Sequence, residues 1–206
     1  MIPGSSALIV FARAPRPGST KTRLIPTVGA ARAAAIYEAL LAHALSCAEA
    51  LPGIARYLFV DHETSMEYFS TRLNAERWRF ATQVTGDLGA RMAAALNLVL
   101  AAHPQAVLVG SDIVDLTSAD LQLGLTRLRD GDEVVLGPSA DGGYWLIGLS
   151  AARPDLFTAL PWGSDTVYQE TVQRMEAGKL RWSRLPLRHD IDTPQDLARF
   201  ANQLGG

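Results

Sequence analysis

The sequence predicts an α/β protein, a three-layer α/β/α sandwich around a mostly parallel central sheet. Strand-sized apolar runs bounded by Gly and Pro alternate with Ala- and Leu-rich segments of helical length. Polar residues and glycines follow several of these runs directly, where an open α/β sheet binds its ligands. The 206 residues show no internal repeat or linker and fit one domain spanning residues 1–206.

The first half of the chain contains the clearest strand. Residues 7–12 are a continuous apolar run, typical of a buried parallel strand, and a loop rich in Pro and Gly follows them. The expected elements, in order, are a strand at residues 7–12, a helix at 30–50, a strand at 57–60, a short helix at 64–73 and a helix at 87–102.

Turn and cap residues mark the second half. Thr117 and Ser118 can cap a helix, and Pro194 suits the first position of the last helix with Asp192 as its cap. The expected elements are a strand at 106–109, a helix ending at residue 129, strands at 133–136 and 144–149, and the final helix.

Composition narrows the class of function. Hydrophobic residues make up 48% of the chain and charged residues 19%, which favours a compact enzyme over a disordered protein. The formal charge of −2 gives no global basic field, so no nucleic-acid partner is expected. Cys47 is the only cysteine; it can form neither an internal disulfide nor a zinc cluster, and we expect it to be buried in a protein of a reducing compartment.

Membrane association is not expected either. The longest apolar runs are too short to cross a bilayer, and residues 1–4 do not begin a signal-peptide pattern. We therefore expect a cytoplasmic protein without a membrane partner.

The loop after the first predicted strand favours phosphate binding. A Gly-containing loop between a strand and a helix can direct backbone N–H groups at an anion, and its Lys and Arg side chains add positive charge. Neither the Walker spacing nor Gly-x-Gly-x-x-Gly is present, and a solvated basic loop is the alternative. The predicted nucleotide-binding residues here are Arg13, Gly18, Ser19, Thr20, Lys21, Thr22 and Arg23.

Carboxylates near the end of the 106–109 strand favour a metal site. Asp112 can hold Mg²⁺ together with substrate phosphates, and it lies too early to cap the next helix. Asp115 is either functional or the cap of that helix. Asp190 can reach back to the same metal, whereas His189 has the pattern of a surface residue. We expect Mg²⁺ or Mn²⁺ on Asp112 and Asp190.

Two glycine-rich segments complete the candidate site. Gly142 and Gly143 let a ligand approach the backbone, and Asp141 can bind a metal or an acceptor hydroxyl, although an ordinary turn is the alternative. Of Tyr144 and Trp145, one is expected in the core and the other in the cleft. The predicted acceptor-binding residues are Asp141, Gly142, Gly143 and Tyr144.

The segment 83–92 is a Gly-rich entry into a helix. Gln83, Gly86 and Arg91 are expected to contact a base or phosphate. Alternatively, Asp87 is only a helix N-terminal charge with Arg91 as its i, i+4 partner.

Taken in order, these motifs resemble a known family. The chain resembles the bacterial radical-SAM/selenodomain-associated transferases, often described as glycosyltransferases, within the nucleotide-diphospho-sugar transferase (GT-A-like) superfamily. It departs from that family at Ile113 and Val114, where Cys-Pro is usual, and at Arg13, where Lys is frequent. The likeness runs from residue 7 to residue 204, through residues 11–15, 21–24, 86–89, 110–112, 137–138, 141–144 and 190–194.

More distantly, residues 22–27 resemble the loop of sugar-phosphate nucleotidyltransferases, and residues 190–194 resemble the end of molybdopterin cytidylyltransferase-like enzymes. This resemblance implies that Lys21 and Arg23 hold a triphosphate and that Asp112 holds Mg²⁺. It also implies that Asp141 or Asp190 completes the metal or acceptor site. The candidate catalytic residues are Lys21, Arg23, Asp112 and Asp141.

The expected function is a metal-dependent transferase with a nucleotide donor. Nucleotidyl transfer from an NTP to a small phosphorylated or hydroxyl acceptor is favoured over glycosyl transfer from a nucleotide sugar. The spacing of Asp112 and Asp115 is not the Asp-x-Asp pair of glycosyltransferases, and the basic loop suits a triphosphate. A non-catalytic nucleotide-binding module is the other alternative, and a dinucleotide-dependent reductase lacks its fingerprint.

Overall fold

A seven-stranded sheet forms the centre of the protein, in the order β3-β2-β1-β4-β6-β5-β7. The computed structural model describes residues 5–200, so residues 1–4 and 201–206, with their part of the predictions, lie outside it. Strand β6 runs antiparallel to both its neighbours, and the other pairs are parallel. The strands are β1 (Ala7–Ala12), β2 (Ala55–Val60), β3 (Trp78–Thr82), β4 (Ala106–Val109), β5 (Val134–Pro138), β6 (Tyr144–Leu149) and β7 (Trp182–Arg184).

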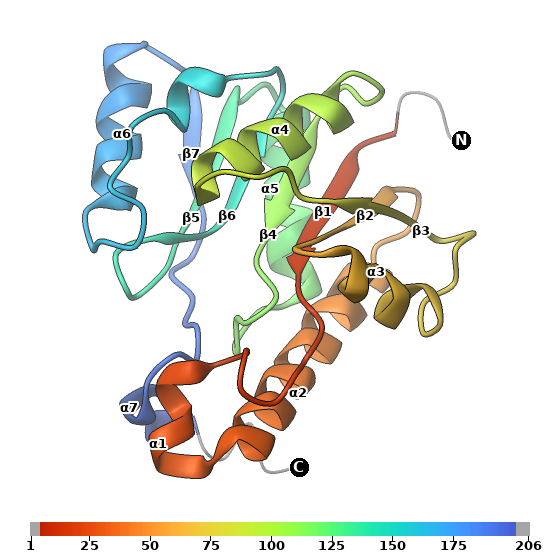
Figure 1. Ribbon diagram of the computed structural model, residues 1–206. Helices are drawn as coiled ribbons and strands as arrows, with labels where there is room; N and C mark the ends of the chain where they lie inside the picture. The colour runs from red at the N-terminus through yellow and green to blue at the C-terminus, as the bar shows by residue number, and fades with distance from the viewer. Residues whose placement is uncertain (1–4, 201–206) are drawn as a thin grey trace.

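Helices cover both faces of the sheet, which makes the predicted three layers (Figure 1). One face packs against α2 (Ala30–Glu49), α3 (Glu63–Ser70) and α5 (Ser118–Arg129). The other face packs against α4 (Leu88–Leu100) and α6 (Val167–Ala177). Among residues 5–200, no helix is both long and apolar enough to span a bilayer.

A small lobe lies below the sheet in Figure 1, on the side where β1 ends. It contains α1 (Ile25–Val28), α7 (Pro194–Arg199) and the start of α2, and the 3-10 turn η1 (Thr22–Leu24) leads into it. Its own apolar cluster includes Leu24, Ile36 and Ile191. The lobe thereby anchors the loop after β1 and the segment before α7, both of which carry predicted site residues.

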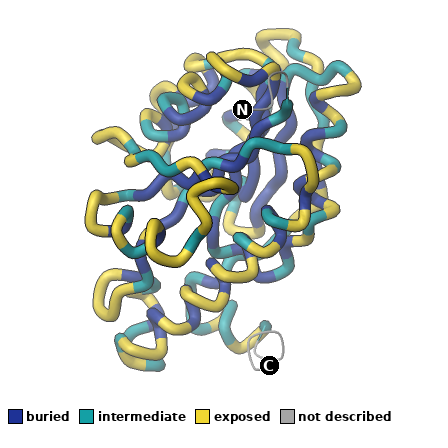
Figure 2. Tube along the Cα trace, turned by 90° about the vertical axis from the view of Figure 1, so that its right-hand side faces the viewer, coloured by how far each residue is buried: buried dark blue, intermediate teal, exposed yellow. Residues whose placement is uncertain are grey.

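Strand β1 shows how the sequence produces a sheet that is covered on both faces. Its alternate side chains bury on both faces: Leu8 and Val10 face α2, while Ile9 faces α4. Figure 2 shows the strands as the buried interior of the protein, with exposed turns around them. A run that is apolar at every position, rather than at alternate positions, is stable only in such a two-sided layer.

The interior strands match the sequence-based predictions most closely. The strands at 7–12, 106–109 and 144–149 have the predicted bounds, and β2 and β5 begin or end within two residues of theirs. Strands β3 and β7 and helix α6 were not predicted. Both strands lie at the edges of the sheet, are partly exposed and lack a continuous apolar run. Helix α6 is largely polar and buries one stripe, Val167, Thr171 and Met175.

The cap of the last helix differs from the prediction. Thr193, not Asp192, caps α7. The Thr193 side chain accepts a hydrogen bond from the backbone N–H of Asp196, and the Asp196 carboxylate accepts one from the backbone N–H of Thr193. Pro194 occupies the first helical position, so the residue directly before it must be the cap. Asp192 is thereby free to face the site. The predictions that Thr117 caps α5 and that Cys47 is buried are confirmed.

Candidate functional site

Loops that follow β1, β2, β3 and β4 surround a cavity of about 390 Å³. Arg13 and residues 19–22 come from the loop after β1, Asp61 follows β2 and Gln83 follows β3. Residues 110–112 follow β4. These four strands are parallel, so their carboxyl ends meet at one edge of the sheet, where ligands of open α/β folds bind.

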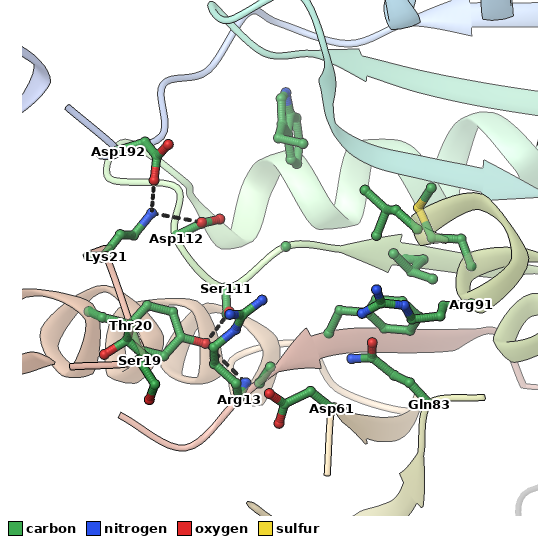
Figure 3. Close-up of a pocket in the computed structure, with 18 of the residues that line it drawn as sticks. Arg13, Ser19, Thr20, Lys21, Asp61, Gln83, Arg91, Ser111, Asp112 and Asp192 are labelled. Atoms are coloured by element: carbon green, nitrogen blue, oxygen red, sulfur yellow. Dashed lines mark hydrogen bonds and ion pairs between the residues drawn. The ribbon is translucent and has the colours of Figure 1, made fainter. Parts of the chain in front are cut away.

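Lys21 lies in this cavity between two carboxylates (Figure 3). Its Nζ donates a hydrogen bond to Oδ2 of Asp112 at 2.9 Å and lies 3.7 Å from Oδ1 of Asp192. Its side chain is 5% exposed. Burial on its own lowers the pKa of Lys21, but the nearby carboxylates, Asp112 first, outweigh it and raise that pKa. Lys21 is therefore an ammonium ion at neutral pH.

The backbone holds Lys21 in an unusual conformation. Its φ of 48° and ψ of 47° place it in the left-handed region, which costs a residue with a side chain about 1 kcal/mol. The neighbouring Thr20 is buried and donates its hydroxyl hydrogen to the carbonyl of Arg16 at 3.0 Å. The surrounding loop thus keeps the Lys21 side chain directed into the cavity.

Arginine and amide side chains form another part of the wall. Arg91 donates from Nε to the carbonyl of Gly86 at 3.0 Å, and Gln83 donates to the carbonyl of Phe59 at 3.0 Å. Figure 3 shows both across the cavity from Lys21. The predicted alternative of an Asp87–Arg91 pair is not what orients Arg91, because Asp87 caps α4 through the N–H of Ala90.

Tyr37 fixes the position of the Arg13 backbone. The Tyr37 hydroxyl accepts the N–H of Arg13 at 3.1 Å and shares a hydrogen bond of 2.8 Å with the hydroxyl of Ser111. Burial raises the pKa of Tyr37, so its hydroxyl stays neutral. These contacts join the loop after β1, helix α2 and the loop after β4 around one side chain.

A second cavity, of about 230 Å³, adjoins the first and shares Asp112, Tyr144 and Trp145 with it. Asp141 and Asp190 line it as well. Burial, together with the negative charges of Asp141 and Asp112, raises the pKa of Asp190 to about 6. Burial and the neighbouring carboxylates therefore both disfavour the ionised form of Asp190.

Asp190 reaches this place because its segment is bonded to the loop after β4. Ile113 and Asp190 form an antiparallel bridge, and the N–H of Val114 donates to the carbonyl of His189 at 2.9 Å. The carboxylate of Asp115 accepts the N–H of His189 at 2.8 Å and lies 2.9 Å from its Nδ1. The alternative that Asp115 caps α5 is therefore wrong. His189 is a mostly buried partner of Asp115 rather than a surface residue.

Two polar atoms beside the second cavity are buried without a hydrogen-bond partner in the described part of the chain: Oη of Tyr144 and Nε1 of Trp162. The ring centroids are 6.1 Å apart and the planes meet at 79°. Gly89 leaves room for the indole, because a Cβ there would lie 2.6 Å from it. Burial raises the pKa of Tyr144. Of Tyr144 and Trp145, one was predicted to lie in the core, and Trp145 is that residue.

The structure brings most of the predicted site residues to the two cavities. Gly18, Arg23, Gly86 and Gly142 do not line either of them, and Arg23 is 72% exposed and paired with Asp192 at 2.6 Å. The predicted residues that line the first are Arg13, Ser19, Thr20, Lys21, Thr22, Gln83, Arg91, Asp112 and Tyr144; those that line the second are Asp112, Asp141, Gly143, Tyr144 and Asp190.

Other lining residues were not predicted. Asp61 directly follows β2, so the rule that assigned Asp112 to the end of its strand also identifies Asp61. Trp162 precedes a helix that the sequence did not reveal, and no pattern marked it. The polar or aromatic residues not predicted to line the site are Phe11, Tyr37, Asp61, Ser111 and Asp192 (predicted as a cap) in the first cavity and Ser139, Trp162 and Ser164 in the second.

The carboxylates fit a divalent cation that is shared with phosphates. Among residues 5–200, no three His, Cys, Asp or Glu side chains form a ready ligand set. Mg²⁺ does not need one, because it takes one or two protein carboxylates and completes its shell with water and substrate phosphates. Asp112 and Asp190 supply such oxygens from segments that the bridge between Ile113 and Asp190 joins.

Comparison with solved structures shows a close relative. A candidate nucleotide-diphospho-sugar transferase from Desulfovibrio desulfuricans G20 is 34% identical and has a TM-score of 0.87, over 94% of this chain and 85% of that chain. No match was found among curated proteins.

Two further structures share the fold at low identity. CMP:2-keto-3-deoxy-manno-octonic acid synthetase, solved with CTP, has a TM-score of 0.58 and 14% identity over 97% of this chain and 98% of that chain. Rv0371c from Mycobacterium tuberculosis H37Rv, solved with manganese, has a TM-score of 0.58 and 18% identity over 97% and 99%. The predicted fold of the nucleotide-diphospho-sugar transferases is confirmed, while the radical-SAM/selenodomain association stays a prediction.

One family model matches residues 44–164, which are more than half of the chain. The protein belongs to the family described as uncharacterized protein conserved in bacteria (DUF2064).

Proposed function

We propose that this protein is a metal-dependent transferase with a nucleotide donor, and that it transfers a nucleotidyl group from an NTP to a small acceptor. One observation carries the proposal: Lys21 is buried, charged and held in a strained conformation inside a cavity that Arg13 and Arg91 also line. Three cations around one cavity suit the phosphates of a nucleotide. The shared fold with a protein solved with CTP supports the same donor class.

The chain's own residues bind and orient the reacting groups. Lys21 holds phosphate oxygens as a point charge, and Arg13 and Arg91 can each hold two oxygens at once. Asp112 and Asp190 would hold a divalent cation, which would neutralise phosphate charge. That a protein of this fold was solved with manganese supports a divalent cation in the site. Positioning and charge neutralisation supply most of the catalysis in such transfers.

The transfer itself is an in-line displacement. An acceptor oxygen forms a bond to the α-phosphorus, the bond from that phosphorus to the bridging oxygen breaks, and pyrophosphate leaves with the electron pair. A hydroxyl acceptor also loses a proton. Asp141 lines the second cavity and accepts only the N–H of Gly143 among the hydrogen bonds of the described residues, so it can take that proton.

Glycosyl transfer is the second candidate. The relative that is 34% identical is described as a candidate nucleotide-diphospho-sugar transferase. The second cavity adjoins the first and is large enough to hold the sugar of such a donor. In that case the nucleoside diphosphate leaves in place of pyrophosphate.

Thermal-shift measurements with the four NTPs and with UDP-, GDP- and ADP-sugars, each with and without Mg²⁺ or Mn²⁺, test the proposal. An NTP at about one hundred times its Kd should stabilise the protein by about 2.7 kcal/mol. We expect this to require metal and to be lost in Asp112→Asn. Asp130→Asn is the control, because Asp130 is an exposed residue at the end of α5, outside both cavities.

Each other outcome changes the proposal in a defined way. Stabilisation by a nucleotide sugar but not by the matching NTP favours glycosyl transfer. Nucleotide binding that needs no metal, with no turnover of any acceptor, favours a non-catalytic module. If no nucleotide stabilises the protein, the phosphate-binding assignment of Lys21 is wrong.

A further inference from the structure

We infer that the second cavity binds the acceptor, and that this acceptor is a neutral polyhydroxylated compound to which Tyr144 and Trp162 form hydrogen bonds. The inference rests on the proposed function, because it names the substrate class of the second half of the same site. The sequence left open whether the acceptor is phosphorylated or reacts through a hydroxyl group, and the inference selects the hydroxyl acceptor.

The first argument is the placement of the unsatisfied polar atoms. Buried polar side-chain atoms almost always have a hydrogen-bond partner, because a buried group without one loses its bonds to water. In residues 5–200, Oη of Tyr144 and Nε1 of Trp162 are the two such atoms without one, and both residues line the same cavity. An indole N–H only donates, and a phenol hydroxyl both donates and accepts. Alcohol groups satisfy both atoms.

The second argument is the charge of the cavity. Among residues 5–200, its lining includes the carboxylates of Asp112, Asp141 and Asp190 but no Lys, Arg or His residue. Lys21, the nearest described cation to Asp112, lies in the first cavity and is paired there. Asp112 is paired with Lys21, and Asp112 and Asp190 are the residues proposed to hold the cation, whereas Asp141 has no cationic partner among the described residues. A phosphate ester beside Asp141 would be repelled, while hydroxyl groups can donate hydrogen bonds to its carboxylate.

The third argument is the shape of the remaining wall. The side chains of Tyr144, Trp145 and Trp162 give it aromatic surface, and Ser139 and Ser164 add hydroxyl groups. Aromatic rings pack on the C–H groups of a polyol while polar side chains bind its hydroxyls. This combination suits a compact ring or chain that carries several alcohol groups and no charge.

The acceptor reaches both polar atoms when the Trp162 segment moves. Solvent does not reach either atom, and Nε1 of Trp162 lies beside Gly89. Trp162 lies between Ala159 and Gly163, which have φ values of 52° and 89°. The strained backbone at Ala159 is relieved when this short segment changes conformation. Moving the indole away from Gly89 and Tyr144 would open both hydrogen-bonding atoms to the cavity.

Matched pairs of compounds test the inference. The probes are D-glucose, D-mannose, myo-inositol and glycerol, each compared with its phosphomonoester, at millimolar concentrations. Binding is measured by ligand-observed saturation-transfer NMR on the full chain, with and without the nucleotide that gives the largest thermal shift. We expect at least one neutral compound to bind and its phosphate ester to bind more weakly.

Two conservative variants locate the binding. Tyr144→Phe removes only the hydroxyl, and Trp162→Phe removes the indole N–H while keeping an aromatic ring. Each should weaken the neutral ligand by about tenfold, as expected for one lost hydrogen bond. Trp162 lines only the second cavity, so Trp162→Phe should also leave nucleotide affinity within about twofold. Tyr57→Phe is the control, because the Tyr57 hydroxyl is bonded to His103 outside the cavity.

Three results would overturn the inference: tighter binding of the phosphate esters, no binding of any neutral probe, or unchanged affinity in both variants. The nucleotide measurement keeps this failure separate from that of the proposed function. A protein that binds nucleotide but prefers phosphorylated acceptors refutes only the acceptor class. A protein that binds no nucleotide refutes the proposed function itself.

Discussion

Replacing Tyr144 with Phe is expected to stabilise the protein in the absence of ligands. Although its ring is partly exposed, the hydroxyl is buried without a partner, which costs about 1–3 kcal/mol of folding free energy. Phe has no hydroxyl to desolvate and keeps the ring that packs on Trp162. The free energy of unfolding should therefore rise by about 1–3 kcal/mol, and Tm by about 2–12 °C for a chain of this length.

Urea denaturation followed by circular dichroism, together with calorimetry, measures the change. Tyr37→Phe is the matched control, because the Tyr37 hydroxyl is equally buried but bonded to Arg13 and Ser111. That variant should lose about 1–3 kcal/mol. If Tyr144→Phe is no more stable than the parent protein, the Tyr144 hydroxyl has a partner after all, and the argument from unsatisfied atoms fails.

Two further variants test the electrostatics around the site. The pKa of Asp190 is raised to about 6, so its ionisation opposes folding. The protonated carboxyl group contributes to the free energy of unfolding fully below about pH 4, and this contribution is lost as the pH rises to about 6. In EDTA, the free energy of unfolding of Asp190→Asn should rise relative to that of the parent protein over this pH range. The expected gain is about 1–2 kcal/mol, which allows for the partial exposure of Asp190. A difference that does not depend on pH would contradict this expectation. Arg188→Met should cost about 3 kcal/mol in urea unfolding, because it removes the cation that donates hydrogen bonds of 2.9 and 2.7 Å to the buried Asp120 carboxylate, which keeps only those from Thr117. A loss below about 1 kcal/mol would refute this.

The sequence predicts the elements that are buried on both sides. Strands β1, β4 and β6 are apolar throughout, so their bounds follow from the residues alone. Edge strands β3 and β7 gain stability from pairing with one neighbour, and their partly exposed side chains leave no distinct pattern. Helix α6 is hidden for the same reason, since only one stripe of it is buried.

The site is predictable where residues follow a strand directly. Lys21, Asp112 and Asp141 were found in this way, and Asp61 could have been. Trp162 could not, because its role depends on an approach to Gly89, far away in the chain, that no local pattern encodes. Asp192 was assigned to the wrong role because a cap and a site residue share the same residue type.

The bonds between the loop after β4 and the segment before α7 also bear on how the site is assembled. The contact between Asp115 and His189 joins residues 74 positions apart in the chain. Contacts of such long separation form late, because closing a long loop costs entropy before any bond rewards it. During synthesis, Asp112 emerges well before Asp190, so the two carboxylates cannot come together until the segment before α7 has left the ribosome and paired with the loop after β4. Ligand binding that needs both of them is therefore confined to molecules whose folding is complete.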